Sequence, residues 1–440
     1  MRFLRIIILL FITLTLHASA AELQPAGSVG DALSSASDGD TIYLQPGTYS
    51  ESLIVNKTVN IIGQESAIID GEIRILADGV ALSGINIIGG GIVIESNGSR
   101  IEGCNVSECA GSGVVIRSSG NSIINCSITR NSLVGMKIWG SNNTVQWNRI
   151  NANDDCGIIV YGDGNVIESN ELLENIHDGM EIEGSSNMIS RNNVSMSHGA
   201  GIEILNMSSG NVIESNDIYG NGECGIEVIE SYENNISGNS LNGNGFGIKT
   251  ERATNNLISS NTVISSIKDG ILISDESRCN IVHRNNASSN HDAGIRIEGS
   301  KDNMVIGNSV HSNAIGIDIS RSENNTIRGN RAMMNGVGIR LDIYSTANTL
   351  YHNAMIDNRQ SALDSSVYYG RNIWDNGSEG NYYSDHICQE VCSPYNIQSG
   401  EERNNIDRFP LSSWDEHLMD IKFVWPISGC ISAYAKGLAI

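Results

Sequence analysis

The sequence has few basic residues, few aromatic residues and no long apolar run beyond its first twenty positions. It carries 27 Lys and Arg against 50 Asp and Glu, which gives a formal net charge of −23. Because binding to phosphate backbones needs clustered Lys and Arg, this balance argues against nucleic acid as a partner. Aromatic residues make up only 5% of the chain, which suits a narrow core filled by stacked aliphatic side chains. No later segment reaches about 18 uninterrupted apolar residues, so we expect no transmembrane anchor.

The first twenty residues have the pattern of a secretory signal peptide. Arg2 and Arg5 precede a short apolar run at residues 6–16, and residues 18–20 read Ala-Ser-Ala, which suits a cleavage site. The final stretch, residues 421–440, is interrupted by two lysines and a proline, so we do not interpret it as an anchor. We therefore expect an exported protein that is extracellular, attached to the cell surface or periplasmic.

Glycine recurs through the middle of the chain at steps of 22 to 24 residues. The series is Gly91, Gly113, Gly135, Gly157, Gly179, Gly201, Gly225, Gly247, Gly270, Gly294, Gly316 and Gly338. Such a period indicates a solenoid with one structural unit per repeat. Each repeat holds three short runs of alternating aliphatic residues and no helical pattern, which predicts three strands and three turns. We therefore predict an all-β right-handed parallel β-helix of about twelve or more coils.

Asparagine recurs in two columns with the same period as the glycines. The first begins with Cys104 and Cys126 and continues through Asn148, Asn170, Asn192, Asn216, Asn239, Asn261, Asn285, Asn308, Asn330 and Asn353. The second contains Asn121, Asn143, Asn165, Asn187, Asn211, Asn234, Asn256, Asn280, Asn303, Asn325 and Asn348. Equivalent positions of successive coils lie above one another, so we predict amide ladders along the rod. We also expect these Asn residues to supply the left-handed backbone that sharp corners require.

The two ends of the β-helix need covers, because open ends expose unpaired strand edges. Residues 28–37 place Val29 and Leu33 on one face of a short helix, with Ser28 and Asp31 able to cap its start. We predict that this helix plugs the first coil. The expected organisation is a signal peptide at 1–20, the β-helix with its amino-terminal cap at 21–372, a carboxyl-terminal cap at 373–412 and an unassigned tail at 413–440.

Two cysteine pairs are candidates for disulfides in an exported chain. Cys104 and Cys126 occupy one ladder column in adjacent coils, so their Cα atoms should lie within disulfide range, with a reduced pair as the alternative. Cys388 and Cys392 could close a small local loop. No Cys-x-x-Cys pairing of a zinc site occurs.

The ends of the repeat array carry a family resemblance. Residues 38–49 (Asp-Gly-Asp-Thr-Ile-Tyr-Leu-Gln-Pro-Gly-Thr-Tyr) precede the repeats, and residues 381–385 (Asn-Tyr-Tyr-Ser-Asp), 394–397 (Pro-Tyr-Asn-Ile) and 406–411 (Ile-Asp-Arg-Phe-Pro-Leu) follow them. Together with the repeats, these segments resemble the NosD-type β-helix family, also described as a carbohydrate-binding and sugar-hydrolysis module. The resemblance implies a β-helix fold and an exported location.

The chain departs from that family at one segment. Related chains usually carry an Asp- and Gly-rich, calcium-loop-like stretch where residues 386–393 here read His-Ile-Cys-Gln-Glu-Val-Cys-Ser. The chain also has no Met- or His-rich cluster with copper-ligand spacing. The resemblance therefore does not establish copper chemistry, and no metal site is predicted there.

Longer corners and outward side chains mark one candidate binding face. Four neighbouring repeats have lengthened corners after the glycine strand, at residues 205–210, 229–233, 251–255 and 274–279, and insertions in a solenoid project as loops from one face. The outward positions of the glycine strands carry Trp139, Tyr161, Glu181, Glu203 and Glu227. Flat aromatic faces beside carboxylates suit a sugar ring. The three stacked glutamates could also hold calcium, since like charges this close need a cation or a raised pKa.

A second hypothesis places catalysis at the corner before the glycine strands. The candidate residues are Asp154, Asp155, His177, Asp178 and Glu181. Paired carboxylates of this kind activate water and protonate the leaving oxygen in polygalacturonases, although the match to that motif is incomplete. An ordinary solvated acidic face is the competing interpretation. The main expectation is an exported protein that binds polysaccharide or cell-envelope glycan or builds the envelope. The alternative is a polysaccharide hydrolase, lyase or epimerase.

Overall fold

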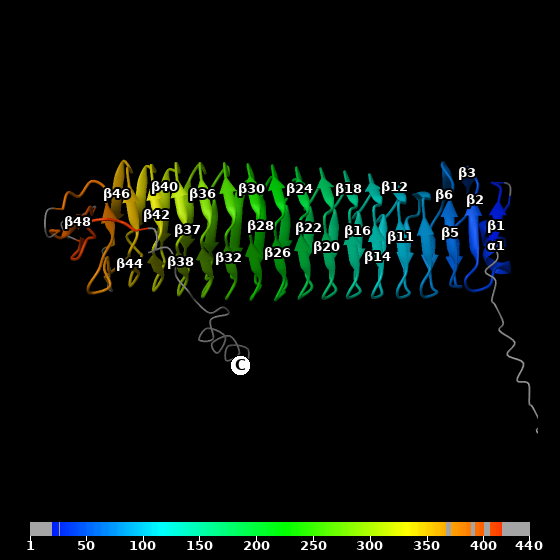
Figure 1. The fold of residues 1–440 in the computed structure, drawn as a ribbon, viewed down its shortest axis with the longest axis horizontal. Helices are drawn as coiled ribbons and strands as arrows, with labels where there is room; N and C mark the ends of the chain where they lie inside the picture. Colours follow the sequence, from blue (N-terminus) through cyan, green and yellow to red (C-terminus); the bar gives the residue numbers. More distant parts are fainter. Residues whose placement is uncertain (1–19, 26, 367–370, 389–391, 400–404, 416–440) are drawn as a thin grey trace, which may run out of the picture.

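The computed structural model of the chain is a long rod of stacked coils (Figure 1). It describes residues 20–25, 27–366, 371–388, 392–399 and 405–415. Nearly all of the predicted signal peptide and most of the predicted tail lie outside these residues. Three parallel sheets of 16, 15 and 16 strands run the length of the rod. The predicted right-handed parallel β-helix is confirmed, with more coils than the twelve glycines marked, because coils at both ends lack the glycine period.

The glycine sheet is the 15-stranded sheet whose strands follow the recurring glycines. Its strands are β4 (Leu53–Val55), β7 (Ile73–Ile75), β10 (Ile92–Ile94), β13 (Val114–Ile116), β16 (Met136–Ile138), β19 (Ile158–Val160), β22 (Met180–Ile182), β25 (Ile202–Ile204), β28 (Cys224–Ile229), β31 (Phe246–Glu251), β34 (Ile271–Ser274), β37 (Ala293–Glu298), β40 (Ile315–Ser320), β43 (Val337–Leu341) and β46 (Gln360–Asp364).

The two 16-stranded sheets form the other faces of the rod. One contains β1 (Ala20–Leu23), β2 (Thr41–Leu44), β5 (Asn60–Gly63), β8 (Ala81–Ser83), β11 (Arg100–Glu102), β14 (Ser122–Ile124), β17 (Thr144–Gln146), β20 (Val166–Glu168), β23 (Met188–Ser190), β26 (Val212–Glu214), β29 (Asn235–Ser237), β32 (Leu257–Ser259), β35 (Ile281–His283), β38 (Met304–Ile306), β41 (Thr326–Arg328) and β44 (Thr349–Tyr351). The other contains β3 (Gly47–Tyr49), β6 (Ala67–Asp70), β9 (Asn86–Gly89), β12 (Asn105–Cys109), β15 (Ser127–Thr129), β18 (Arg149–Asn151), β21 (Glu171–Leu173), β24 (Asn193–Ser195), β27 (Asp217–Tyr219), β30 (Ser240–Asn242), β33 (Thr262–Ile264), β36 (Asn286–Ser288), β39 (Ser309–His311), β42 (Arg331–Met333), β45 (Ala354–Ile356) and β47 (Tyr382–Tyr383).

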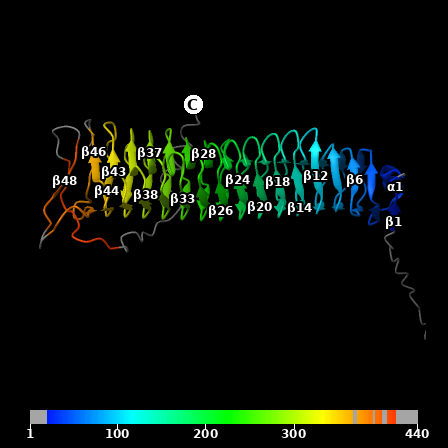
Figure 2. The same cartoon turned by 90° about the horizontal axis from the view of Figure 1, so that it is seen from above.

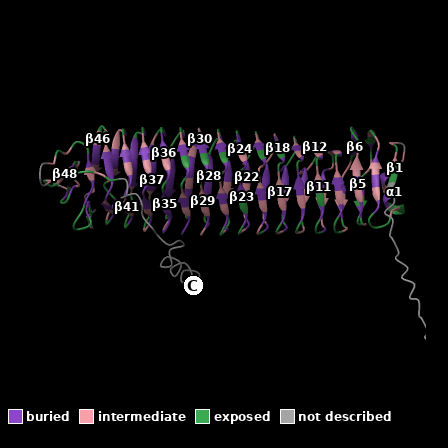
Figure 3. Cartoon of the chain, viewed as in Figure 1, coloured by how far each residue is buried: buried purple, intermediate pink, exposed green. Residues whose placement is uncertain are grey.

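One apolar core fills the rod from end to end. Alternate side chains of each short strand point inward, as at Ile202 and Ile204 in β25, which are both fully buried. Buried residues therefore follow the strands along the rod, and exposed residues gather mainly at the corners (Figure 3). Because the inward side chains are so similar from coil to coil, the coils differ mainly in their outward side chains.

The two predicted Asn columns form ladders inside the rod. The Asn192 backbone N–H and Nδ2 both donate to Asn216 Oδ1, at 2.9 and 3.0 Å, and Nδ2 also donates to the Ile167 carbonyl at 2.9 Å. A third column, which sequence analysis missed, contains Asn131, Asn153, Asn175, Asn221, Asn244, Asn290, Asn313, Asn335 and Asn358. Ser197 and Ser266 interrupt it, and this broken period hid the column.

The left-handed backbone lies one residue before the position that we predicted. Ser215 and Ser260, which precede the ladder residues Asn216 and Asn261, both have φ 56°. The ladder Asn side chains point inward and are buried, so their amides serve the ladder. The preceding residue makes the corner, often at a cost, because non-glycine residues adopt this conformation reluctantly.

The predicted helix covers the first coils. Helix α1 (Val29–Ser35) is capped by the Ser28 side chain, which accepts from the Asp31 N–H, and it buries Val29 and Leu33. Glu51 accepts hydrogen bonds from the Val29 and Gly30 N–H groups. Strand β1 precedes the helix in the chain and pairs in parallel with β2.

Residues of the family-like segments tie down the opposite end of the rod (Figures 1 and 2). Strands β48 (Tyr395–Ile397) and β49 (Asn405–Asp407) pair antiparallel there. Tyr383 stacks on Tyr395 with ring centroids 3.7 Å apart, and Tyr383 donates its hydroxyl to the buried Asp407 at 3.2 Å. Asp407 also accepts from the Asn381 N–H at 2.7 Å. These motif residues therefore have structural roles.

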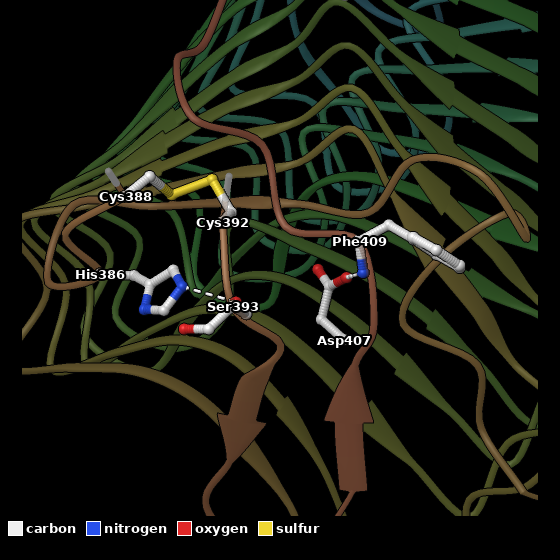
Figure 4. Close-up of a disulfide and its surroundings, with 6 residues drawn as sticks. All are labelled: His386, Cys388, Cys392, Ser393, Asp407 and Phe409. Atoms are coloured by element: carbon white, nitrogen blue, oxygen red, sulfur yellow. Dashed lines mark hydrogen bonds between the residues drawn. A yellow bond between two sulfur atoms is a disulfide. The ribbon is translucent and has the colours of Figure 1, made fainter. Parts of the chain in front are cut away.

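The two predicted disulfides have different outcomes. Cys388 and Cys392 are bonded, beside His386, which donates to the Ser393 carbonyl (Figure 4). The predicted Cys104–Cys126 disulfide is wrong, because both are free, buried thiols. In-register parallel coils point equivalent side chains in the same direction. The Cys126 thiol accordingly donates to backbone carbonyls, such as that of Ile124 at 3.3 Å.

Candidate functional site

The outer face of the glycine sheet stacks side chains from successive coils into columns. In the central column, Ile159 pairs with Glu181, Glu181 with Glu203, Glu203 with Glu227, and Glu227 with Lys249. Neighbouring members are therefore separated by about 4.8 Å, the spacing of paired strands. The predicted stacking of the three glutamates is present.

Two aromatic rings form an exposed platform on this face. Trp139 and Tyr161 stack with ring centroids 3.8 Å apart and an interplanar angle of 13°, and Trp139 is 52% exposed. Val134, Cys156 and Ile159 form a small apolar cluster beneath Tyr161. We call Trp139 and Tyr161 the aromatic platform. Each ring covers one face of the other, so the exposed Trp139 supplies the apolar ring surface that a sugar can contact.

Four carboxylates in the next two coils form what we call the acid patch: Asp178, Glu181, Glu183 and Glu203. Partial burial, followed by the neighbouring Glu183, raises the pKa of Glu181 to about 7. Partial burial, followed by the charge of Asp178, raises the pKa of Glu203 to about 7. None of the four forms an ion pair with any residue that the structure describes.

Glu227 differs from the other two glutamates of its column. Its exposed fraction is only 6%, and Lys249 Nζ lies 3.0 Å from its carboxylate and 2.6 Å from that of Glu251. Burial disfavours the charged form of Lys249, but hydrogen bonds to Glu251 and Glu227 outweigh it and raise the pKa of the ammonium. Glu227 is therefore already neutralised from within the chain.

The predicted catalytic residues do not all meet. The side chains of Asp154 and His177 are exposed, and the Asp155 carboxylate accepts a hydrogen bond from the Cys156 N–H at 2.9 Å. Asp178 and Glu181 do approach each other, with Cys156 as the third member of a cluster whose polar atoms lie within 4.8 Å. Asp178 also accepts from the Ala200 N–H at 2.6 Å, so it ties two coils together. Its part in this backbone contact was not foreseen.

The cluster of Cys156, Asp178 and Glu181 fits neither copper nor calcium well. Burial raises the pKa of the Cys156 thiol, which keeps it protonated, whereas copper binds thiolate, imidazole and thioether ligands. Calcium takes six to eight oxygen ligands, and this cluster supplies only two carboxylates beside a thiol. Among the described residues, no other cluster of three such groups is close enough to hold a metal.

A groove follows the lengthened corners beside the glycine sheet. Its volume is about 640 Å³, and its lining is mostly charged: Met207, Glu230, Arg252, Thr254, Glu276, Arg278, Gly299, Ser300, Lys301, Arg321 and Glu323. Residues of the predicted corner insertions thus line this groove. Its charges are largely engaged with one another, as in the contact of Arg252 with Glu230 at 2.8 Å.

Comparison with known families and structures agrees with the fold. The family described as "Periplasmic copper-binding protein (NosD)" matches residues 225–388, and the family described as "Right handed beta helix region" matches residues 73–211 and 148–286. No curated protein matches the sequence. Helices of the described residues include none long and apolar enough to span a bilayer.

Solved structures with the same architecture act on polysaccharides. A mannuronic acid specific family 6 polysaccharide lyase from human gut microbiota is 15% identical with a TM-score of 0.53, and the match covers 69% of this chain and 87% of the lyase. A mutant form of the periplasmic alginate epimerase AlgG is 14% identical with a TM-score of 0.42, and the match covers 65% of this chain and 77% of the epimerase. At 15% identity the likeness to the lyase shows the fold, which is compatible with a polysaccharide-related role.

Proposed function

We propose that this chain, a right-handed parallel β-helix protein similar to the pectin-lyase-like superfamily, is an exported glycan-binding protein of the cell surface or periplasm. Its binding face is the outer face of the glycine sheet around Trp139, Tyr161, Glu181 and Glu203. The rod makes this face long and straight, so that a polymer can lie along it. The observation that carries the proposal is the exposed aromatic stack directly beside half-buried carboxylates.

Binding is favoured over hydrolysis by the state of the carboxylates. A glycosidase needs one carboxyl group kept protonated and a second kept ionised. Here Glu181 and Glu203 have similar environments, and burial raises the pKa of each to about 7. Their environments therefore do not single out one side chain as the acid and the other as the base. Both side chains can instead hydrogen-bond to sugar hydroxyls in either protonation state.

A carbohydrate-active enzyme is the second candidate, favoured by the raised pKa values of Asp178, Glu181 and Glu203. Such shifts gather at catalytic sites, although structural clusters also show them. A hydrolase, lyase or epimerase would release shortened or altered chains from a bound polysaccharide. Chromatography of oligosaccharides after prolonged incubation tests this, with Glu203→Gln as the variant that should abolish any product.

A glycan array on the mature protein tests the main proposal. The wild type should bind at least one polysaccharide class, and Trp139→Ala should weaken that binding about fivefold or more through lost ring stacking. Trp147→Ala is the matched control, because Trp147 is 60% exposed but follows β17 of a 16-stranded sheet, on another part of the coil. Equal loss in both variants, or no loss in either, would overturn the proposed face. Absence of binding to any glycan would overturn the proposed function.

A further inference from the structure

The acid patch lacks a counter-charge that the rest of the face possesses. Farther along the same column, Arg296 contacts Asp269 at 3.3 Å and Asp318 at 3.1 Å, and Arg340 forms two hydrogen bonds of 2.8 Å to Asp318. Basic residues on that part of the face are therefore engaged by carboxylates of neighbouring coils. In the acid patch, four carboxylates have no such partner among the described residues.

Lys249 is an ammonium group that this face already binds through its outward carboxylates. Its ammonium is held between Glu227 and Glu251, which belong to the same two outward columns as Glu203 and Glu183. In the central column, the residue that follows Glu227 is Lys249, whereas the residue that follows Glu181 is Glu203. The chain therefore supplies no ammonium group next to Glu181. Lys137 is the nearest basic residue of the central column, and it lies two coils from Glu181.

We infer that the aromatic platform and the acid patch together bind a polysaccharide that contains amino sugars. A pyranose ring would stack on the face of Trp139 that Tyr161 does not cover, and an ammonium group on other sugars of the chain would lie among Glu181, Glu183 and Glu203. This inference rests on the proposed glycan-binding function and specifies its ligand. A charge-assisted hydrogen bond to a partly desolvated carboxylate is stronger than one formed in open water.

The same charges disfavour an acidic glycan. A polyuronate carries one carboxylate per sugar, and it would meet the acid patch on a chain whose formal net charge is −23. The cations Lys249, Arg296 and Arg340 are already ion-paired with carboxylates and would have to abandon those contacts to receive it. The carboxylates of a bound polyuronate and those of the acid patch would repel each other unless a cation lay between them. A glycan that bears ammonium groups would reduce the repulsion among the carboxylates of the acid patch, whereas a uronate would add to it.

Calorimetric titration of the mature protein with three matched hexasaccharides tests the inference. The probes are β-1,4-linked glucosamine, its N-acetylated form and an oligomannuronate, at pH 6 and low salt, where most amino groups of the glucosamine oligomer are protonated. We expect the glucosamine oligomer to bind about tenfold or more tightly than the N-acetylated one, and the oligomannuronate to bind weakest. The Glu181→Gln, Glu203→Gln double variant should lose most of this preference.

Two controls separate a specific site from attraction to the overall negative charge. The Glu298→Gln, Glu323→Gln double variant removes the same charge from the partly exposed Glu298 and the exposed Glu323, which pair with Arg321 and Lys301, and it should keep the preference. Trp139→Ala should weaken binding of both the amino and the N-acetylated oligomer. Equal affinity of the wild type for these two oligomers, with Trp139 still required, would overturn the amino-sugar inference and leave the proposed function standing. Binding that ignores Trp139 would overturn both.

Discussion

Two stretches of the glycine sheet share one interior and differ outside. The open stretch, from Gly135 to Leu205, exposes an aromatic stack and carboxylates without ion-pair partners among the described residues. The paired stretch, from Gly225 to Leu341, matches its outward cations to carboxylates of neighbouring coils. Inside, the same Asn ladders and aliphatic layers run through both. Stability therefore lies in the repeated interior, and a binding role is to be sought where outward side chains lack partners.

The ladder variants should cause the largest effect, and it should be equal in both stretches. Asn192→Leu in the open stretch and Asn285→Leu in the paired stretch each strand buried ladder partners on both sides. We expect a loss of about 3 kcal/mol in the free energy of unfolding for each variant, measured by chemical denaturation. Asn242→Leu, at an exposed strand end, is the control and should cost much less. Unequal losses at the two ladder sites would contradict a uniform interior.

The ion pairs of the paired stretch should give the next largest effect. Arg340→Met leaves the fully buried Asp318 with Arg296 alone, so we expect a loss of about 2 kcal/mol in the free energy of unfolding. Arg321→Met, whose side chain is 60% exposed, should cost less than about 0.5 kcal/mol. Similar small losses in both variants would show that Asp318 does not depend on its partners.

Acid-patch variants should have the opposite sign and depend on pH. Glu181 and Glu203 have pKa values of about 7 when folded, above the value of about 4.3 for unfolded Glu, so the folded state holds their protons more tightly. The loss of folding stability that these two half-buried carboxyl groups cause is therefore absent below pH 4 and grows as the pH rises to about 7. Glu203→Gln should accordingly stabilise the protein by about 1 kcal/mol at pH 8 and by nearly nothing at pH 4. The exposed Glu108→Gln is the control, and identical pH profiles for both variants would contradict this assignment.

The fold was predictable from the sequence because its determinants repeat. Glycine and Asn recur once per coil, so each repeat reports the same strand and the same ladder. The third ladder was missed because Ser197 and Ser266 break its period. The left-handed corners were misplaced by one residue, since Ser, Gly, Arg and other residues share that position and form no compositional signal.

The site was less predictable because it depends on contacts between coils. Sequence analysis placed Trp139, Tyr161, Glu181 and Glu203 on one face, and they lie there. It did not foresee that Lys249 would neutralise Glu227, or that Asp178 would accept from the backbone of the next coil. It also paired Cys104 with Cys126 from the coil spacing, and the structure has both as free thiols that contact each other without a covalent bond.

Oxidative footprinting of Trp139 and Trp147, the exposed tryptophans of the part of the chain that the structure describes, tests the proposed binding face. Mass spectrometry would follow hydroxyl-radical oxidation of Trp139 in the open stretch and of Trp147 on the other part of the coil, with and without saturating oligosaccharide. A ligand on the proposed face covers one indole and leaves the other in solvent. We predict that oxidation of Trp139 slows severalfold while that of Trp147 stays unchanged. Unchanged oxidation of Trp139 in a demonstrably bound complex would contradict the proposed face.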